Sequence, residues 1–74
     1  RIAADLQAGK VSAVEGYVHK TVSRRRRSTH YYYRIEGLRF LVSYPAYNAL
    51  VEGIPYRVYY TPRSKQMVAI EPIG

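Results

Sequence analysis

Apolar and polar side chains alternate with a period of two along most of this 74-residue chain, which predicts strands that each bury one face. The first such segment runs from residue 11 to residue 22 and turns Val14, Val18 and Val22 inward. Gly16 lies in its middle, where a glycine predicts a bend or a bulge. Four further segments with this period follow, so the pattern predicts five short strands; the later four cover residues 30–36, 38–43, 56–61 and 66–71.

A helical period interrupts the strands after residue 43. Ala46 is followed by apolar residues three and four positions later, and Pro45 suits the first turn of a helix. Gly53 suits the position after the last turn. The sequence therefore predicts one short helix, Pro45–Val51, between the third and fourth strands.

Residues 1–10 differ from the rest, because three alanines and Leu6 precede Gly9. This composition is typical of the end of a helix that a glycine closes. We therefore expect a helical or extended lead-in over residues 1–10 and a single domain over residues 11–74.

Five strands with one apolar face each must curl around a shared core in a chain this short, and closure also removes exposed sheet edges. The order of three strands, a helix and two strands is typical of a small five-stranded OB-like barrel, so the fold class we predict is all-β. An SH3-like barrel is the main alternative, although its usual helical turn falls between the last two strands, where this chain has only a tight turn. The predicted core consists of Val14, Val18, Tyr33, Ile35, Phe40, Val42, Leu50, Val58, Val68 and Ile70.

Positive charge is concentrated in one part of the chain. The net charge is +7, and six of the 12 basic residues fall between residues 16 and 35, where there is no acidic residue. Outside that segment six basic residues face five acidic ones. We therefore expect any electrostatic partner to meet the protein at this segment.

Four consecutive arginines occupy the loop between the first and second predicted strands, shortly before the run Tyr31–Tyr33. The OB-fold uses this loop, together with the face of strands two and three, to contact oligonucleotides. Alternation turns Tyr31 and Tyr33 inward and leaves Tyr32 on the outer face beside Arg34. The candidate ligand-binding residues are therefore Arg24, Arg25, Arg26, Arg27, Tyr32 and Arg34.

Several interpretations of these residues stay open. The tyrosines serve either as filling at the edge of the core or as a stacking surface for bases, which would join Tyr17, Tyr32 and Tyr59 if their strands adjoin. The arginine loop serves as a solvated hairpin tip, as a contact to anionic lipid headgroups or an acidic protein, or as part of a nucleic-acid site. A short arginine run by itself discriminates weakly among these roles.

Catalytic and metal chemistry find little support among the residues. The chain has no cysteine, which excludes a disulfide scaffold, and its two histidines, His19 and His30, are too few for a typical zinc site. The five acidic residues are dispersed singly, without the paired carboxylates or the nucleophile and base that catalysis needs. We therefore expect a protein that is not an enzyme and that uses no cofactor, no metal and no small-molecule substrate.

The segments DLQAGKVSAVEGYV, HYYYRIEGLRFLVSYPAYNAL and YRVYYTPRSKQMVAIEPI together span nearly the whole chain. In this pattern the sequence resembles the soluble C-terminal domain of a family of small, uncharacterised bacterial integral membrane proteins. The shared features are a DLxxGxV opening, a basic variable loop, YYYRIEGLRF, a YRVYYTPRSK hairpin and an IEP ending. These features are chiefly structural, so the resemblance implies a fold and a membrane tether but no activity.

The resemblance also implies that transmembrane helices precede Arg1 and that residues 1–8 form the exit from the last of them. An arginine-rich loop close to a membrane segment favours the cytoplasmic face. The function we predict is that of a non-catalytic interaction or scaffolding domain of a membrane-tethered protein, with its basic loop on anionic lipid or an acidic partner. The alternative is an OB-type module that binds single-stranded nucleic acid.

Overall fold

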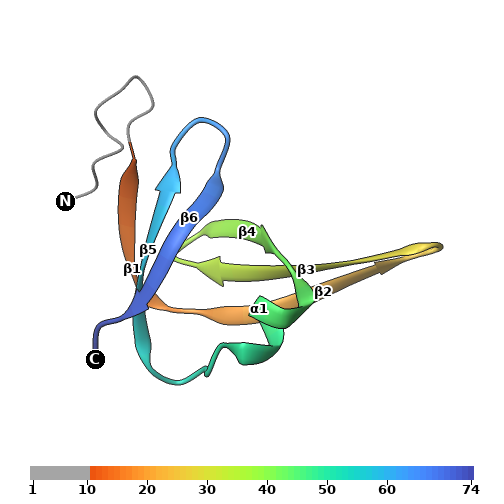
Figure 1. Ribbon diagram of the computed structural model, residues 1–74, viewed down its shortest axis with the longest axis horizontal. Coiled ribbons are helices and arrows are strands. Elements are labelled where there is room, and N and C mark those ends of the chain that lie inside the picture. The colour runs from red at the N-terminus through yellow and green to blue at the C-terminus, as the bar shows by residue number, and fades with distance from the viewer. Residues whose placement is uncertain (1–10) are drawn as a thin grey trace.

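The computed structural model of the protein describes residues 11–74, which form six strands and one short helix (Figure 1). The predicted lead-in over residues 1–10 lies outside the described residues. The strands form two antiparallel three-stranded sheets, with the orders β1-β5-β6 and β2-β3-β4. This confirms the all-β class and the helix between the third and fourth predicted strands. The elements are β1 (Ser12–Tyr17), β2 (His19–Arg25), β3 (Ser28–Ile35), β4 (Leu38–Val42), α1 (Tyr44–Ala49), β5 (Pro55–Thr61) and β6 (Gln66–Pro72).

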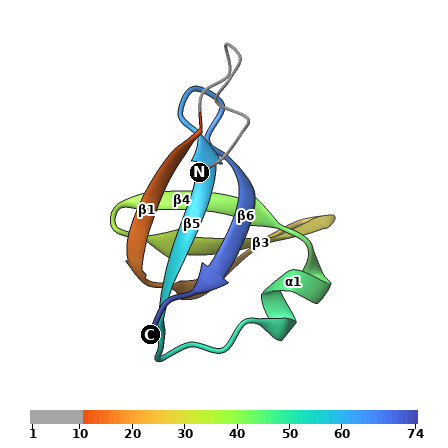
Figure 2. The same cartoon turned by 60° about the vertical axis from the view of Figure 1, so that its left-hand side comes forward.

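The predicted closed barrel of five strands is wrong, because the first predicted strand divides into two. β1 ends at Tyr17 and β2 begins at His19, and the two strands belong to different sheets. Val18 at the break is only 1% exposed and packs into the core. Figure 2 shows the strands of one sheet crossing those of the other at a steep angle. Each sheet thus covers the apolar face of the other, so the core is buried without closure of a barrel.

The two sheets meet along an open seam on one side. Within residues 11–74, β4 and β6 lie against each other without hydrogen-bonded pairing. On the opposite side the chain passes directly from β1 into β2 through Val18, so a single bent segment serves both sheets. The bend that Gly16 predicts is therefore present, two residues later than the glycine itself.

The core fills the space between the sheets and draws on both of them. Phe40 from β4 and Val58 from β5 have no exposed surface. Among the predicted core residues, three are only partly buried and pack against the rest, namely Val14, Val42 and Ile70. Tyr56 is buried as well, on the face of β5 that alternation turns inward. The predicted core residues that are fully buried are Val18, Tyr33, Ile35, Phe40, Leu50 and Val58.

Val68 and Val22 are exposed although alternation turns both inward, and each has a separate cause. A β-bulge between Tyr59 and Tyr60 shifts the pairing of β5 with β6, so Val68 has no partner and is 53% exposed. Met67, one residue earlier, packs against the core in its place. Val22 keeps the predicted face opposite Tyr31, but beyond this row β4 no longer pairs with β3, and Val22 is 37% exposed.

The helix α1 is shorter than predicted at its C-terminal end. Ser43 caps its N-terminus, because its hydroxyl accepts a hydrogen bond from the backbone N–H of Ala46 at 3.3 Å. Leu50 has an extended backbone, with φ −74° and ψ 135°, and its side chain is buried. The chain must leave the helix at Leu50 to bury that side chain, so α1 ends at Ala49 and not at Val51.

Two tyrosine hydroxyls attach α1 and the segment after it to the strands. The hydroxyl of Tyr33 donates to the backbone carbonyl of Ala46, and that of Tyr56 donates to the carbonyl of Val51 at 2.8 Å. Both rings are buried while both hydroxyls are satisfied, which is how tyrosine fills a core edge. The pKa of Tyr33 is raised by its burial and, to a smaller extent, by the charge of Tyr56.

We predict that Phe40→Ala lowers the free energy of unfolding by about 3–5 kcal/mol, because it empties the centre of the core. Leu41→Ala is the matched control, since Leu41 is the next residue of the same strand and is 61% exposed. This control should change the free energy by about 0.5 kcal/mol at most. Urea unfolding followed by circular dichroism measures both values, and equal losses in the two variants would contradict the assigned core.

We predict that Tyr33→Phe costs about 1 kcal/mol at pH 8, through loss of the hydrogen bond to Ala46. A raised native pKa favours the neutral phenol, so this contribution is complete below the unfolded value of 10.0. It is lost as the pH rises through the native pKa. The difference between wild type and variant in urea unfolding should therefore shrink above pH 10, and a difference that does not change with pH would refute this role.

Candidate functional site

The hairpin of β2 and β3 extends beyond the body of the domain (Figure 1). The two strands pair from His19 opposite Arg34 out to Arg25 opposite Ser28. β4 pairs with β3 only from Tyr31 inward to the turn, so the outer part of the hairpin is a two-stranded ribbon. Both faces of this outer ribbon are solvated. We call the whole hairpin, formed by β2 and β3, the basic hairpin.

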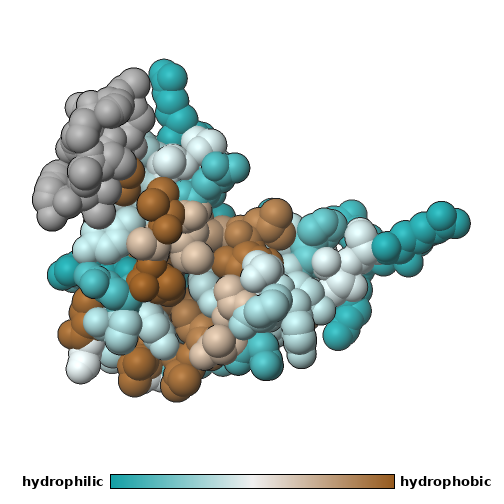
Figure 3. Space-filling model, in the orientation of Figure 1, coloured by the Kyte–Doolittle hydropathy of each residue, from teal (hydrophilic) through white to brown (hydrophobic). Residues whose placement is uncertain are grey.

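The four consecutive arginines form the tip of the basic hairpin. Arg24 and Arg25 end β2, while Arg26 and Arg27 make the two-residue turn into β3. All four are exposed, and Figure 3 shows a hydrophilic projection at this end of the molecule. Within residues 11–74 the ion pairs are those that Arg57 makes with two glutamates, so none of the four tip arginines is neutralised by such a pair.

Tyr32 and Arg34 lie on the outer face of the sheet β2-β3-β4, as alternation predicts. The register places Tyr32 between Thr21 and Leu41 on the flanking strands. The next row toward the turn places Arg34 between His19 and Arg39. The guanidinium carbon of Arg39 lies 4.2 Å from the centre of the Tyr32 ring, a cation–π contact that joins the two rows.

The six candidate residues therefore divide into two groups. Thr21, which is opposite Tyr32, is four residues along β2 from Arg25, a distance of about 13 Å. The tip arginines form one group, and Tyr32 and Arg34 form the other at the base of the hairpin.

The tyrosines that the sequence offers as a composite stacking surface also divide. Tyr17 and Tyr59 belong to the sheet β1-β5-β6, whereas Tyr32 belongs to the other sheet. Tyr59 further donates its hydroxyl to Glu71 at 2.9 Å. Of these three tyrosines, Tyr32 therefore lies on the same sheet as the basic residues of β2-β3-β4.

An aromatic cluster on the inner side of the basic hairpin was not predicted. The ring of Tyr31 lies 5.1 Å from that of Tyr44 and 4.8 Å from that of Tyr47, centre to centre. Tyr31 faces inward as expected, but it meets the helix α1 and not the central core. Lys20 from β2 lies 5.1 Å above the Tyr47 ring and donates to the carbonyl of Leu50 at 3.0 Å, which fixes the helix against the sheet.

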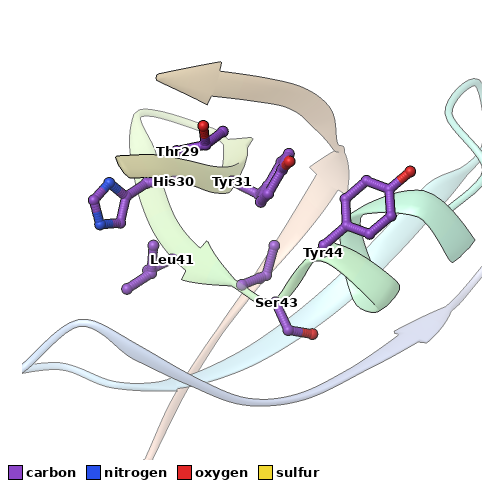
Figure 4. A pocket seen from close by; sticks show the side chains of 7 residues that line it. Thr29, His30, Tyr31, Leu41, Ser43 and Tyr44 are labelled. Carbon is purple, nitrogen blue, oxygen red and sulfur yellow. The ribbon is translucent and has the colours of Figure 1, made fainter. Parts of the chain in front are cut away.

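An open groove of about 460 Å³ lies beside this cluster, where β4 ends and leaves the edge of β3 uncovered. Its walls include His30, Tyr31, Leu41 and Tyr44 (Figure 4). His30 and His19 are both on β-strands of this sheet but lie on different rows of the ladder. No group of three or more potential metal-ligating side chains exists within residues 11–74.

Arg39 and His19 are the basic neighbours that sequence reasoning missed. Alternation places both on outer faces, but it does not say what stands opposite. Glu36 and Gly37 form a two-residue turn with φ of 44° and 81°, which sets the register of β3 on β4 and so brings Arg39 opposite Arg34. The dipeptide EG between two alternating segments was the signal for this pairing.

Comparison with known proteins returns no match, whether to a protein-family model, to a curated protein or to a solved structure. Across residues 11–74, no helix combines the length and the apolar character that a membrane crossing requires.

We predict that Arg26→Asn with Arg27→Gly stabilises the protein by about 0.5–2 kcal/mol, because Asn-Gly lets the tip turn change to the conformation with positive φ at both positions. Hairpin turns of two residues favour positive φ at both positions, as at Glu36–Gly37. Among residues 11–74 neither Arg26 nor Arg27 has a positive φ, so the tip turn departs from this preference. Urea unfolding measures the gain, and a loss of stability would show that the arginines serve the hairpin itself.

A substitution in the other two-residue turn, between β3 and β4, provides the control. Gly37→Arg should be destabilising by about 1–3 kcal/mol, because an L side chain is strained at a φ of 81°. Equal changes in the free energy of unfolding for the variants at the two turns would contradict the difference in φ between them.

Proposed function

We propose that this domain is a non-catalytic interaction module held at a membrane, whose basic hairpin contacts anionic lipid headgroups. The single observation that carries the proposal is the projection of four exposed arginines beyond the body of the domain. A short solvated ribbon gains little stability by itself, and this tip lacks the turn geometry that would favour a hairpin. Its arginines are therefore better explained by a partner than by folding.

The charges at the tip suit a lipid surface. Each basic residue near an anionic bilayer contributes about 1 kcal/mol, and this attraction falls off within a Debye length. A tip that projects from the domain brings its charges within that range while the body stays outside it. An acidic protein would bind the same arginines and is the alternative partner for this surface.

Apolar and aromatic side chains at the base of the basic hairpin support contact with a bilayer interface. Tyr44 is 54% exposed, and Val22 is exposed on the same side of the hairpin as the cluster of Tyr31. Tyrosine favours the headgroup region of a membrane, because its ring is apolar and its hydroxyl stays solvated.

We propose, as part of the same function, a membrane tether and an OB-like fold. The resemblance of the motifs to a family of small bacterial membrane proteins supports a tether outside this chain and a position on the cytoplasmic face. We also propose that the fold is an open variant of the OB-like arrangement. One bent segment that serves both sheets and a helix between β4 and β5 support this view.

Single-stranded nucleic acid is the second candidate, favoured by Tyr32 beside Arg34 and Arg39 on the outer face of the sheet. Base stacking needs an accessible ring and contributes about 1–3 kcal/mol per base. The guanidinium of Arg39 already lies over the Tyr32 ring, and no second tyrosine of the composite shares this sheet. We therefore rank this candidate below the lipid contact.

We predict that replacing Arg24–Arg27 with serine lowers partition onto anionic vesicles about a thousandfold, at about 1 kcal/mol for each arginine. Co-sedimentation with phosphatidylserine-containing vesicles measures the change, and neutral phosphatidylcholine vesicles give the baseline. Equal pelleting of variant and wild type would dismiss the lipid contact.

Two double variants test whether vesicle binding depends on the position of the arginines or only on the net charge of the protein. Arg26→Ser with Arg27→Ser removes the same charge as Arg63→Ser with Lys65→Ser in the turn between β5 and β6. The tip pair should lose most of the binding, while the other pair should stay close to wild type. A short oligonucleotide bound more tightly than the vesicles, and weakened by Tyr32→Ala, would replace this proposal with the second candidate.

A further inference from the structure

Three basic side chains form a row across the sheet β2-β3-β4. His19, Arg34 and Arg39 are directly opposite one another on the three strands and share the outer face. Residues opposed in this way have Cβ atoms about 4.5–5.5 Å apart, so the Arg34 and Arg39 side chains leave the sheet from adjacent positions. We call this set the basic row.

Within residues 11–74, no carboxylate forms an ion pair with the two arginines of the basic row. Four glutamates occur within residues 11–74, and three of them have partners other than the basic row. Glu15 and Glu71 contact Arg57 at 2.7 and 3.1 Å on the other sheet. Glu52 accepts a hydrogen bond from the Lys20 backbone N–H at 2.7 Å.

Glu36, the nearest glutamate in sequence, forms no ion pair with Arg34 or Arg39. Its Oε2 lies 2.8 Å from the position that a Cβ would occupy on Gly16, so its side chain rests against β1. Like charges directly opposite each other destabilise a sheet. A bound anion would relieve that cost, which makes the row a candidate for anion recognition.

The surroundings of the basic row are organised for a small ligand. An open cavity of about 470 Å³ is bordered by Arg34, Arg39 and Tyr32, with the hydroxyl-bearing residues Thr21 and Ser23 farther along β2. The contact of Arg39 with the Tyr32 ring holds one guanidinium in place before any ligand arrives. Planar guanidinium groups bind the oxygens of a phosphate through paired hydrogen bonds.

We infer that the basic row is a binding site for a phosphate monoester, distinct from the contact that the hairpin tip makes. A phosphate monoester carries close to two negative charges at neutral pH, which matches the two guanidinium groups, whereas a diester carries one. The row is six residues along β2 from Arg25, about 20 Å. This site therefore goes beyond the proposed membrane contact, and either can fail without the other.

The test is a titration of the whole chain followed by amide chemical shifts at constant ionic strength. Methyl phosphate and inorganic phosphate are the probes, and dimethyl phosphate is the diester control. We expect saturable shifts centred on Arg34 and Arg39, with the diester at least tenfold weaker. Arg34→Gln and Arg39→Gln should each weaken methyl phosphate about tenfold or more, while Arg63→Gln, in a distant turn, should leave it unchanged.

The outcomes separate the sources of the phosphate. The first comparison uses a variant in which serine replaces Arg24–Arg27. If this variant binds phosphatidic acid vesicles more tightly than phosphatidylserine vesicles, and Arg39→Gln abolishes the difference, the ligand is a lipid headgroup. Binding of methyl phosphate without that preference would identify a free monoester. Shifts that do not saturate, equal affinity for the diester, or equal effects of Arg39→Gln and Arg63→Gln would each overturn the site.

Discussion

Burial of Val18 between the two sheets is the constraint on which the rest of the structure depends. This residue stands where the chain leaves β1 and enters β2, so the point at which the chain passes from one sheet to the other is fixed in the core. One bent segment then supplies a strand to each sheet, and the sheets can cross and cover each other. Phe40 and Val58, one from each sheet, complete the contact and have no exposed surface.

This arrangement also explains why the candidate surfaces lie where they do. After Val18, β2 continues past the region that the opposite sheet covers, and β3 returns along it. β4 ends at Val42 because the chain must turn into α1, whose carbonyl at Ala46 is held by Tyr33. The outer ribbon is left with neither a third strand nor a second layer, so its arginines are available to a partner.

The outer faces of the two sheets differ in how their charges are balanced. On β1-β5-β6, Arg57 lies between Glu15 and Glu71 and forms an ion pair with each of them. On β2-β3-β4, Arg34 and Arg39 form no ion pair with any residue among 11–74. Ion pairs this exposed contribute little to stability, so the contrast bears on recognition more than on folding.

Alternation in the sequence by itself determined the all-β class, the inward faces of most strands, the approximate position of the helix, and the placement of Tyr32 and Arg34 outside. These properties are local, because successive side chains of a strand point to opposite faces. The tertiary structure alone decided the division at Val18, the bulge that exposes Val68, and the alignment of Arg34 with Arg39. Each of these depends on which strands pair and in what register, and pairing partners are set by contacts between residues far apart in the chain.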